Sequence, residues 1–185
     1  MRIVGAVGQI GSGKDTVISY ISKRFSTPIL SIGDIARKIA RNKGLPATRE
    51  NLQEITQKCF EEFGRTYFIE ETIKKIRNGN EERVLITGIR APTDVEALRD
   101  CFQHDFILIC VMADRKTRFQ RLVKRAESRD PVAWREFLRQ DEAEEQIFHL
   151  SRTCKLADYR INNEGTPEEL FKKVDEIIQE RLADW

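Results

Sequence analysis

The chain has 185 residues, 34% of them charged and 40% hydrophobic, with a formal net charge of +2 at pH 7. This length allows one substantial hydrophobic core and argues against two independent domains. The small net charge argues against a general nucleic-acid binder, and no apolar run approaches the roughly 18 residues of a membrane span.

The first predicted elements flank a glycine-rich loop. Residues 2–7 predict a buried parallel strand and residues 15–25 a helix with apolar positions at helical spacing. Because Met1 leads directly into the strand, we expect no signal peptide and a cytoplasmic protein. Between strand and helix, Gly-x4-Gly-Lys is complete at Gly8, Gly13 and Lys14.

This P-loop pattern has a specific physical purpose. Its glycines let backbone N–H groups surround phosphates, the following helix N-terminus attracts anions, and Lys14 can follow a transferring phosphoryl group. The predicted nucleotide-phosphate site consists of Gly8, Gly11, Ser12, Gly13, Lys14, Asp15 and Thr16. A dinucleotide fingerprint fits less well, because Ala6 stands where its first glycine is needed.

Asp15 departs from the usual loop. It occupies the position at which a Ser or Thr hydroxyl normally meets magnesium. We therefore expect an unusual metal site in which Asp15 helps to organise Mg²⁺. Thr16 follows as a second polar residue.

The rest of the chain alternates between predicted strands and helices. Strands are expected at residues 28–32, 83–87, 105–112 and 159–161. Helices are expected at residues 35–41, 49–63, 66–77 and 93–101, from 114 onward, at 132–146 and after 166. This order predicts one three-layer α/β domain over residues 1–185, with a five-stranded parallel sheet covered by helices on both faces.

Charged residues follow several of these strands, at the sheet edge where α/β proteins bind ligands. Asp34 and Arg37 follow the second strand, Arg90 the third and Asp114 the fourth. Asp34 can orient or deprotonate an acceptor hydroxyl, and Arg37 and Arg90 can bind an anionic acceptor. The alternatives are a helix N-cap for Asp34 and a solvated turn residue for Arg90.

One predicted helix is unusually rich in arginine. Four arginines share one of its faces: Arg118, Arg121, Arg125 and Arg129. Like charges at this spacing destabilise a helix unless an anion meets them, which favours phosphate binding by a movable lid that also excludes water. The alternative is a solvated basic face, partly neutralised by Glu127, Asp130 and Glu136.

The cysteines give no metal signature. Cys59, Cys101, Cys110 and Cys154 show no Cys-x-x-Cys spacing, and the two histidines lie far from a zinc pattern. For a cytoplasmic protein, reduced and mostly buried thiols are expected in preference to a disulfide.

Together these segments resemble small P-loop kinases of the adenylate kinase and dephospho-CoA kinase group, over nearly the whole chain. Residues 31–37, Ser-Ile-Gly-Asp-Ile-Ala-Arg, resemble the Ser-x-Gly-Asp-x-x-Arg of nucleoside monophosphate kinases. Arg121 and Arg125 resemble the Arg-x-x-x-Arg at the start of the lid in these kinases. Residues 157–165 resemble a dephospho-CoA kinase segment, Ala-Asp-x-x-Ile-x-Asn-x-Gly, that usually lies near the adenine. Closer still is a largely uncharacterised, mainly archaeal group of adenylate kinase-related proteins, which residues 129–137 also resemble.

The resemblance implies an ATP- and Mg²⁺-dependent kinase for a small acceptor that already carries a phosphate. A nucleoside monophosphate is the leading acceptor and dephospho-CoA the alternative. Residues 33–63 would form a helical acceptor-binding insert and residues 125–152 the lid. Lys14, Asp34, Arg121 and Arg125 would act in catalysis, with Asn163 and Gly165 beside the donor nucleotide. No nucleic-acid or membrane partner is expected.

One departure bears on activity. Adenylate kinases usually carry an aspartate at the end of the third strand, where this chain has Thr87. Our hypothesis is that Asp15 takes over part of the metal-organising role. The departure also leaves open an ATP-binding regulatory module that transfers nothing.

Overall fold

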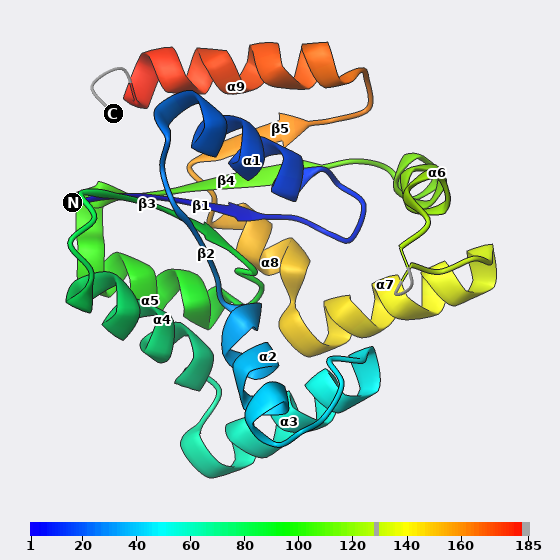
Figure 1. Ribbon diagram of the computed structural model, residues 1–185. Helices are drawn as coiled ribbons and strands as arrows, with labels where there is room; N and C mark the ends of the chain where they lie inside the picture. The colour runs from blue at the N-terminus through cyan, green and yellow to red at the C-terminus, as the bar shows by residue number, and fades with distance from the viewer. Residues whose placement is uncertain (128–129, 183–185) are drawn as a thin grey trace.

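A single parallel sheet forms the centre of the computed structural model, which describes residues 1–127 and 130–182 (Figure 1). Its strand order is β2-β3-β1-β4-β5. The strands are β1 (Arg2–Val7), β2 (Ile29–Ser31), β3 (Arg83–Thr87), β4 (Phe106–Met112) and β5 (Tyr159–Asn162). The predicted five-stranded fold is confirmed. Since β1 lies between β3 and β4, the loop after β1 emerges at the middle of the carboxyl edge.

Helices cover both faces of this sheet. They are α1 (Lys14–Phe25), α2 (Gly33–Asn42), α3 (Arg49–Phe63), α4 (Tyr67–Asn78), α5 (Pro92–Phe102), α6 (Arg115–Arg125), α7 (Trp134–Phe148), α8 (Leu150–Lys155) and α9 (Pro167–Arg181), with a 3₁₀ turn at Gln103–Asp105. In Figure 1, α1 and α9 lie on one face, and α4, α5 and α8 on the other. Within the described ranges, no helix is both long and apolar enough to cross a membrane.

The alternation of side chains along β1 creates two hydrophobic cores. Val4 and Ala6 pack into the core shared with α1 and α9. Ile3 and Val7 pack into the other core, with residues of α2, α3, α4, α5 and α8. Because consecutive residues of a strand point to opposite faces, a strand buried on both sides is apolar throughout.

Two helix ends match those expected from the sequence, and two differ from them. Asp114 caps α6 by accepting a hydrogen bond from the N–H of Thr117 at 2.7 Å, and Thr166 caps α9. Asp34 is not an N-cap: α2 begins at Gly33, and Asp34 lies inside its first turn. The helix predicted at residues 132–146 continues to Phe148, and His149, with φ of 54°, separates it from an unpredicted short helix, α8.

The expectation of reduced thiols is wrong for two cysteines. A disulfide joins Cys110 in β4 to Cys154 in α8, whereas Cys59 and Cys101 are free. The two partners are 44 residues apart in sequence, so their spacing carries no motif. They meet because α8 packs beneath the sheet in the same core as Cys110.

Candidate active site

The glycine-rich loop between β1 and α1 is packed too closely for side chains at three positions, Gly8, Gly11 and Gly13. Gly11 has φ of 78° and Gly13 φ of 97°, in the left-handed region that favours glycine. A Cβ on Gly11 would lie 2.7 Å from the backbone oxygen of Arg118, and one on Gly13 would collide with Asn163. The loop therefore lies directly against α6 and the segment after β5.

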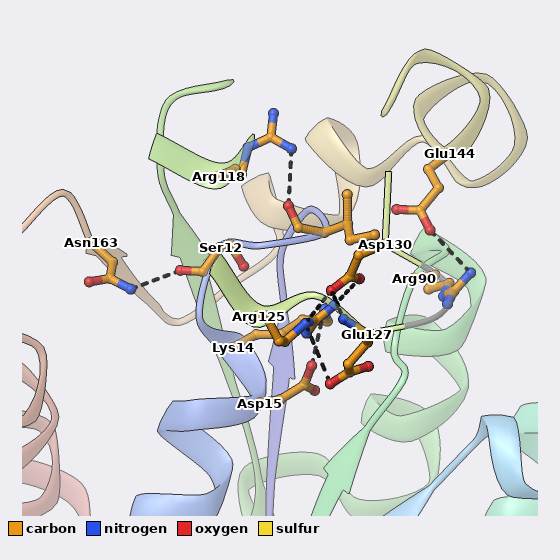
Figure 2. Close-up of polar contacts among 11 residues, drawn as sticks. Ser12, Lys14, Asp15, Arg90, Arg118, Arg125, Glu127, Asp130, Glu144 and Asn163 are labelled. Atoms are coloured by element: carbon orange, nitrogen blue, oxygen red, sulfur yellow. Dashed lines mark hydrogen bonds and ion pairs between the residues drawn. The ribbon is translucent and has the colours of Figure 1, made fainter. Parts of the chain in front are cut away.

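Two buried polar groups at this loop have no hydrogen-bond partner among the residues that the structure describes. The Ser12 side chain is fully buried and its hydroxyl is unpartnered, as is Nη1 of Arg121. Asn163 donates to the Ser12 carbonyl at 2.8 Å (Figure 2). Nη2 of Arg121 donates to the Gly165 carbonyl at 3.3 Å. Unpartnered buried polar groups are costly, so their presence at a phosphate-binding loop fits a nucleotide with anionic oxygens.

The charged end of the loop is open to solvent. Nζ of Lys14 lies 3.6 Å from the carboxylate of Asp15, whose side chain is 60% exposed (Figure 2). No group of three or more His, Cys, Asp or Glu side chains suited to a metal occurs within residues 1–127 and 130–182. Mg²⁺ commonly uses one or two carboxylates with phosphate oxygens and water, and Asp15 with Thr16 fits such a site.

The arginines of α6 do not form one anion-binding face. Arg118 is 3% exposed and forms a two-pronged ion pair with Asp141 of α7, at 2.6 and 3.0 Å. Arg125 donates to the buried Asp130 at 2.8 Å, and this hydrogen bond raises the pKa of Arg125. The carboxylates of Asp141 and Asp130 thus offset the repulsion between these arginines. Arg129 lies outside the described residues.

The three predicted acceptor residues lie at the same carboxyl edge, on neighbouring strand ends. The N–H of Ile32, after β2, donates to the carbonyl of Thr87, the last residue of β3, at 3.0 Å. Asp34 and Arg37 form an ion pair on α2, with side chains 60% and 40% exposed. Arg90 follows β3 on the adjacent loop.

Arg90 is not simply a solvated turn residue. Its Nη1 lies 3.6 Å from Oε1 of Glu144 (Figure 2), and its guanidinium lies 5.0 Å from the ring centroid of Phe148. Both partners belong to α7. The backbone N–H groups of Arg90 and Ala91 donate to Asp94 at 2.9 Å, while burial raises the pKa of that carboxyl group.

Sequence reasoning missed the roles of Asp141, Glu144 and Asp94. Asp141 and Glu144 are three residues apart on α7 and so share a face, but their arginine partners are distant in sequence. Asp94 had a local signal: it lies at the third position of a helix that begins with Pro92, where a carboxylate can bind free N–H groups.

Comparisons with known proteins agree with this geometry. Residues 7–139 match the family described as AAA domain. A UPF0200 protein of Pyrococcus horikoshii is 34% identical over 99% of both chains. The UPF0200 protein MJ1399 of Methanocaldococcus jannaschii is 32% identical over 98% of this chain and 91% of its own.

Solved structures of similar fold include kinases. A shikimate kinase from Bacteroides thetaiotaomicron matches with a TM-score of 0.64 and 14% identity, over 100% of this chain and 99% of the other. A gluconokinase from Sinorhizobium meliloti matches with a TM-score of 0.61 and 13% identity, over 94% and 89%. At these identities the likeness shows a shared P-loop kinase fold and leaves the substrate open.

Proposed function

Since the chain belongs to the UPF0200 family and has a P-loop kinase-like fold, we propose that it is an ATP- and Mg²⁺-dependent phosphotransferase. The proposed acceptor is a small molecule that already bears a phosphate, with a nucleoside monophosphate as the leading candidate. The observation that carries the proposal is a pair of buried groups at the Gly-x4-Gly-Lys loop, on Ser12 and Arg121, that have no hydrogen-bond partner in the described part of the chain.

The donor side uses the loop and the helices around it. Backbone N–H groups of residues 8–14 would surround the phosphates, with Lys14 and Arg121 neutralising charge as the phosphoryl group moves. Asn163 and Gly165 both accept hydrogen bonds from Arg121, which supports placing these two residues beside the bound nucleotide. Bound Mg²⁺ would supply further charge neutralisation on the phosphates.

The acceptor side uses the neighbouring strand ends. Asp34 would orient or deprotonate the acceptor hydroxyl, and Arg37 and Arg90 would bind its anionic group. Helices α2 and α3, within the predicted insert at residues 33–63, lie below this edge in Figure 1. The predicted lid, residues 125–152, contains α7, which contacts Arg90 through Glu144.

The proposal is tested by measuring ATP consumption against a panel of nucleoside monophosphates and dephospho-CoA. Turnover is expected with at least one nucleoside monophosphate, and Lys14→Ala should abolish it. Turnover with dephospho-CoA alone would establish the alternative acceptor. Turnover only with an unphosphorylated hydroxy acid, such as gluconate or shikimate, would overturn the phosphate-bearing acceptor. ATP binding without turnover on any acceptor would favour the regulatory module.

The metal-organising role of Asp15 needs its own measurement. Asp15→Ser restores the usual hydroxyl, so the Mg²⁺ concentration for half-maximal turnover should change while ATP-analogue affinity without metal stays the same. Unchanged metal dependence and turnover would refute the role. The proposed reaction requires no nucleic-acid or membrane partner, and a cytoplasmic location stays a prediction.

A further inference from the structure

Arg118 lies buried where the P-loop, α6 and α7 meet. Its Nε donates to the carbonyl of Ala113 at 3.1 Å, and its Nη1 donates to the carbonyl of Ile10, inside the P-loop, at 3.3 Å. The same guanidinium donates to both carboxylate oxygens of Asp141. One side chain therefore joins the phosphate-binding loop to the lid helix.

The surrounding packing leaves this junction little freedom. The guanidinium carbon of Arg118 lies 5.2 Å from the ring centroid of Phe137, which is fully buried. The backbone of Arg118 also approaches Gly11 so closely that a Cβ there would collide with it. Asp141 is 6% exposed and receives a second hydrogen bond, from Nε of Arg115 at 3.0 Å.

Stability alone is a weak reason for such a pair. Removing two charges from water costs free energy that their attraction only partly returns, and apolar residues of similar volume often stabilise a protein as well. What apolar residues could not supply is the hydrogen bond to the Ile10 carbonyl. That bond fixes one peptide of the loop that surrounds the phosphates.

We propose that Arg118 and Asp141 are positioning residues for the nucleotide. The pair holds the P-loop backbone at Ile10 in its phosphate-binding shape and makes that shape depend on helix α7 of the lid. The inference rests on the proposed function only in naming a nucleotide as the ligand. Its physical content, the ordering of the loop, can be measured without one.

The test uses the double variant Arg118→Met/Asp141→Met, which removes both charges and leaves neither buried alone. The matched control is Arg115→Met, which removes the other hydrogen bond to Asp141 and is not itself hydrogen-bonded to the loop in the described structure. The readout is hydrogen exchange at the amide of Ser12, which donates to the Gln9 carbonyl at 3.1 Å. We expect exchange about tenfold faster in the double variant, from the loss of a hydrogen bond to a charged group, and unchanged exchange in the control.

A second readout is the affinity for a non-hydrolysable ATP analogue. Its Kd should rise about tenfold in the double variant and less than about twofold in the control, with similar melting temperatures. A folded double variant with wild-type exchange at Ser12 and wild-type Kd overturns the inference. If that variant does not fold, Arg118→Lys replaces it in the test. Lysine keeps the charge but lacks the planar guanidinium that donates to Asp141 and Ile10 at the same time. Arg118→Lys should shift both readouts in the same direction, and no shift in either overturns the inference. A wild-type protein that binds no nucleotide refutes the proposed function, while exchange at Ser12 still decides whether the pair orders the loop.

Discussion

The disulfide between Cys110 and Cys154 should contribute a large part of the stability of this protein. It ties α8, the short helix after α7, to strand β4, which pairs with β1. Both cysteines are buried, at 0% and 7% exposure, so the bridge also lies within the main hydrophobic core. We consider its removal by reduction and by Cys154→Ala.

The expected magnitude follows from the loop that the bridge closes. Cys110 and Cys154 are 44 residues apart. The chain-entropy model assigns a bridge of this loop length about 4 kcal/mol at 25 °C, through the restricted unfolded chain. For a protein of this size, about 4 kcal/mol corresponds to a fall in Tm of about 8–16 °C. The cavity left by Cys154→Ala should make the variant slightly less stable than the reduced wild-type protein.

Thiol labelling and thermal unfolding check this. Unfolded without reductant, the protein should expose two reactive thiols, those of Cys59 and Cys101, and four after reduction. Reductant should lower the Tm of the wild-type protein and of the control Cys101→Ala, but not that of Cys154→Ala. Four reactive thiols in the absence of reductant, or a wild-type Tm that does not change when reductant is added, would refute this stabilising role of the disulfide.

Three further predictions concern the loop and the helix caps. Gly11→Ala places a methyl group against backbone atoms at a left-handed position, so calorimetry should detect no nucleotide binding. Gly44 is also left-handed, with φ of 68°, but has open space around it. Gly44→Ala should therefore lower the free energy of unfolding by about 1 kcal/mol and leave nucleotide binding intact. Asn163→Ala removes a buried hydrogen bond to the Ser12 carbonyl and should lower the free energy of unfolding by about 1–3 kcal/mol in urea titrations. The hydrogen bond from the Thr117 N–H lowers the pKa of Asp114. The cap therefore stabilises the fold above about pH 4, and this stabilisation disappears as the pH falls through the lowered pKa. In thermal scans, the Tm difference between the wild-type protein and Asp114→Ala should shrink below about pH 4.

The sheet and the P-loop were predictable because their signals are local. Strand β3 was predicted with its observed bounds, Arg83–Thr87, from a short apolar run that follows a turn segment at residues 78–80. The Gly-x4-Gly-Lys spacing identified a loop whose conformation requires glycine at Gly11 and Gly13. These features depend on a few neighbouring residues, and so can be read from sequence.

The partners of the arginines were not predictable in the same way. Helical periodicity placed Arg118 and Arg125 on one face, but it contains no information on whether a carboxylate 23 residues away, Asp141, would enter the same interior. Nor does it indicate that α7 would end at Phe148, because the left-handed residue that follows is His149 and not the glycine that usually marks a helix end. Packing between elements decides both.

The partners of Arg121 and Arg125 on α6 suggest that the two arginines act at different steps of the proposed reaction. Within the described structure, Arg121 donates only to uncharged oxygens and its buried Nη1 has no partner. In the proposed reaction it can therefore bind donor phosphates without first breaking an ion pair. Arg125 must first leave the buried Asp130, and breaking a buried ion pair costs about 3–5 kcal/mol. In the proposed reaction, that separation belongs to closure of the predicted lid and not to initial binding.

The two arginines should therefore affect different kinetic quantities. Arg121→Ala is expected to raise the Kd of an ATP analogue by about tenfold or more, from the loss of charge-assisted hydrogen bonds to phosphate. Arg125→Ala should leave that Kd within about twofold and lower kcat, because its interaction with phosphate is made only after closure. Lys124→Ala, an exposed change on the same helix, serves as the control for both. Equal losses of affinity in the two arginine variants would show that Arg125 already contacts the nucleotide before the lid closes, and that the ion pair with Asp130 does not restrain it.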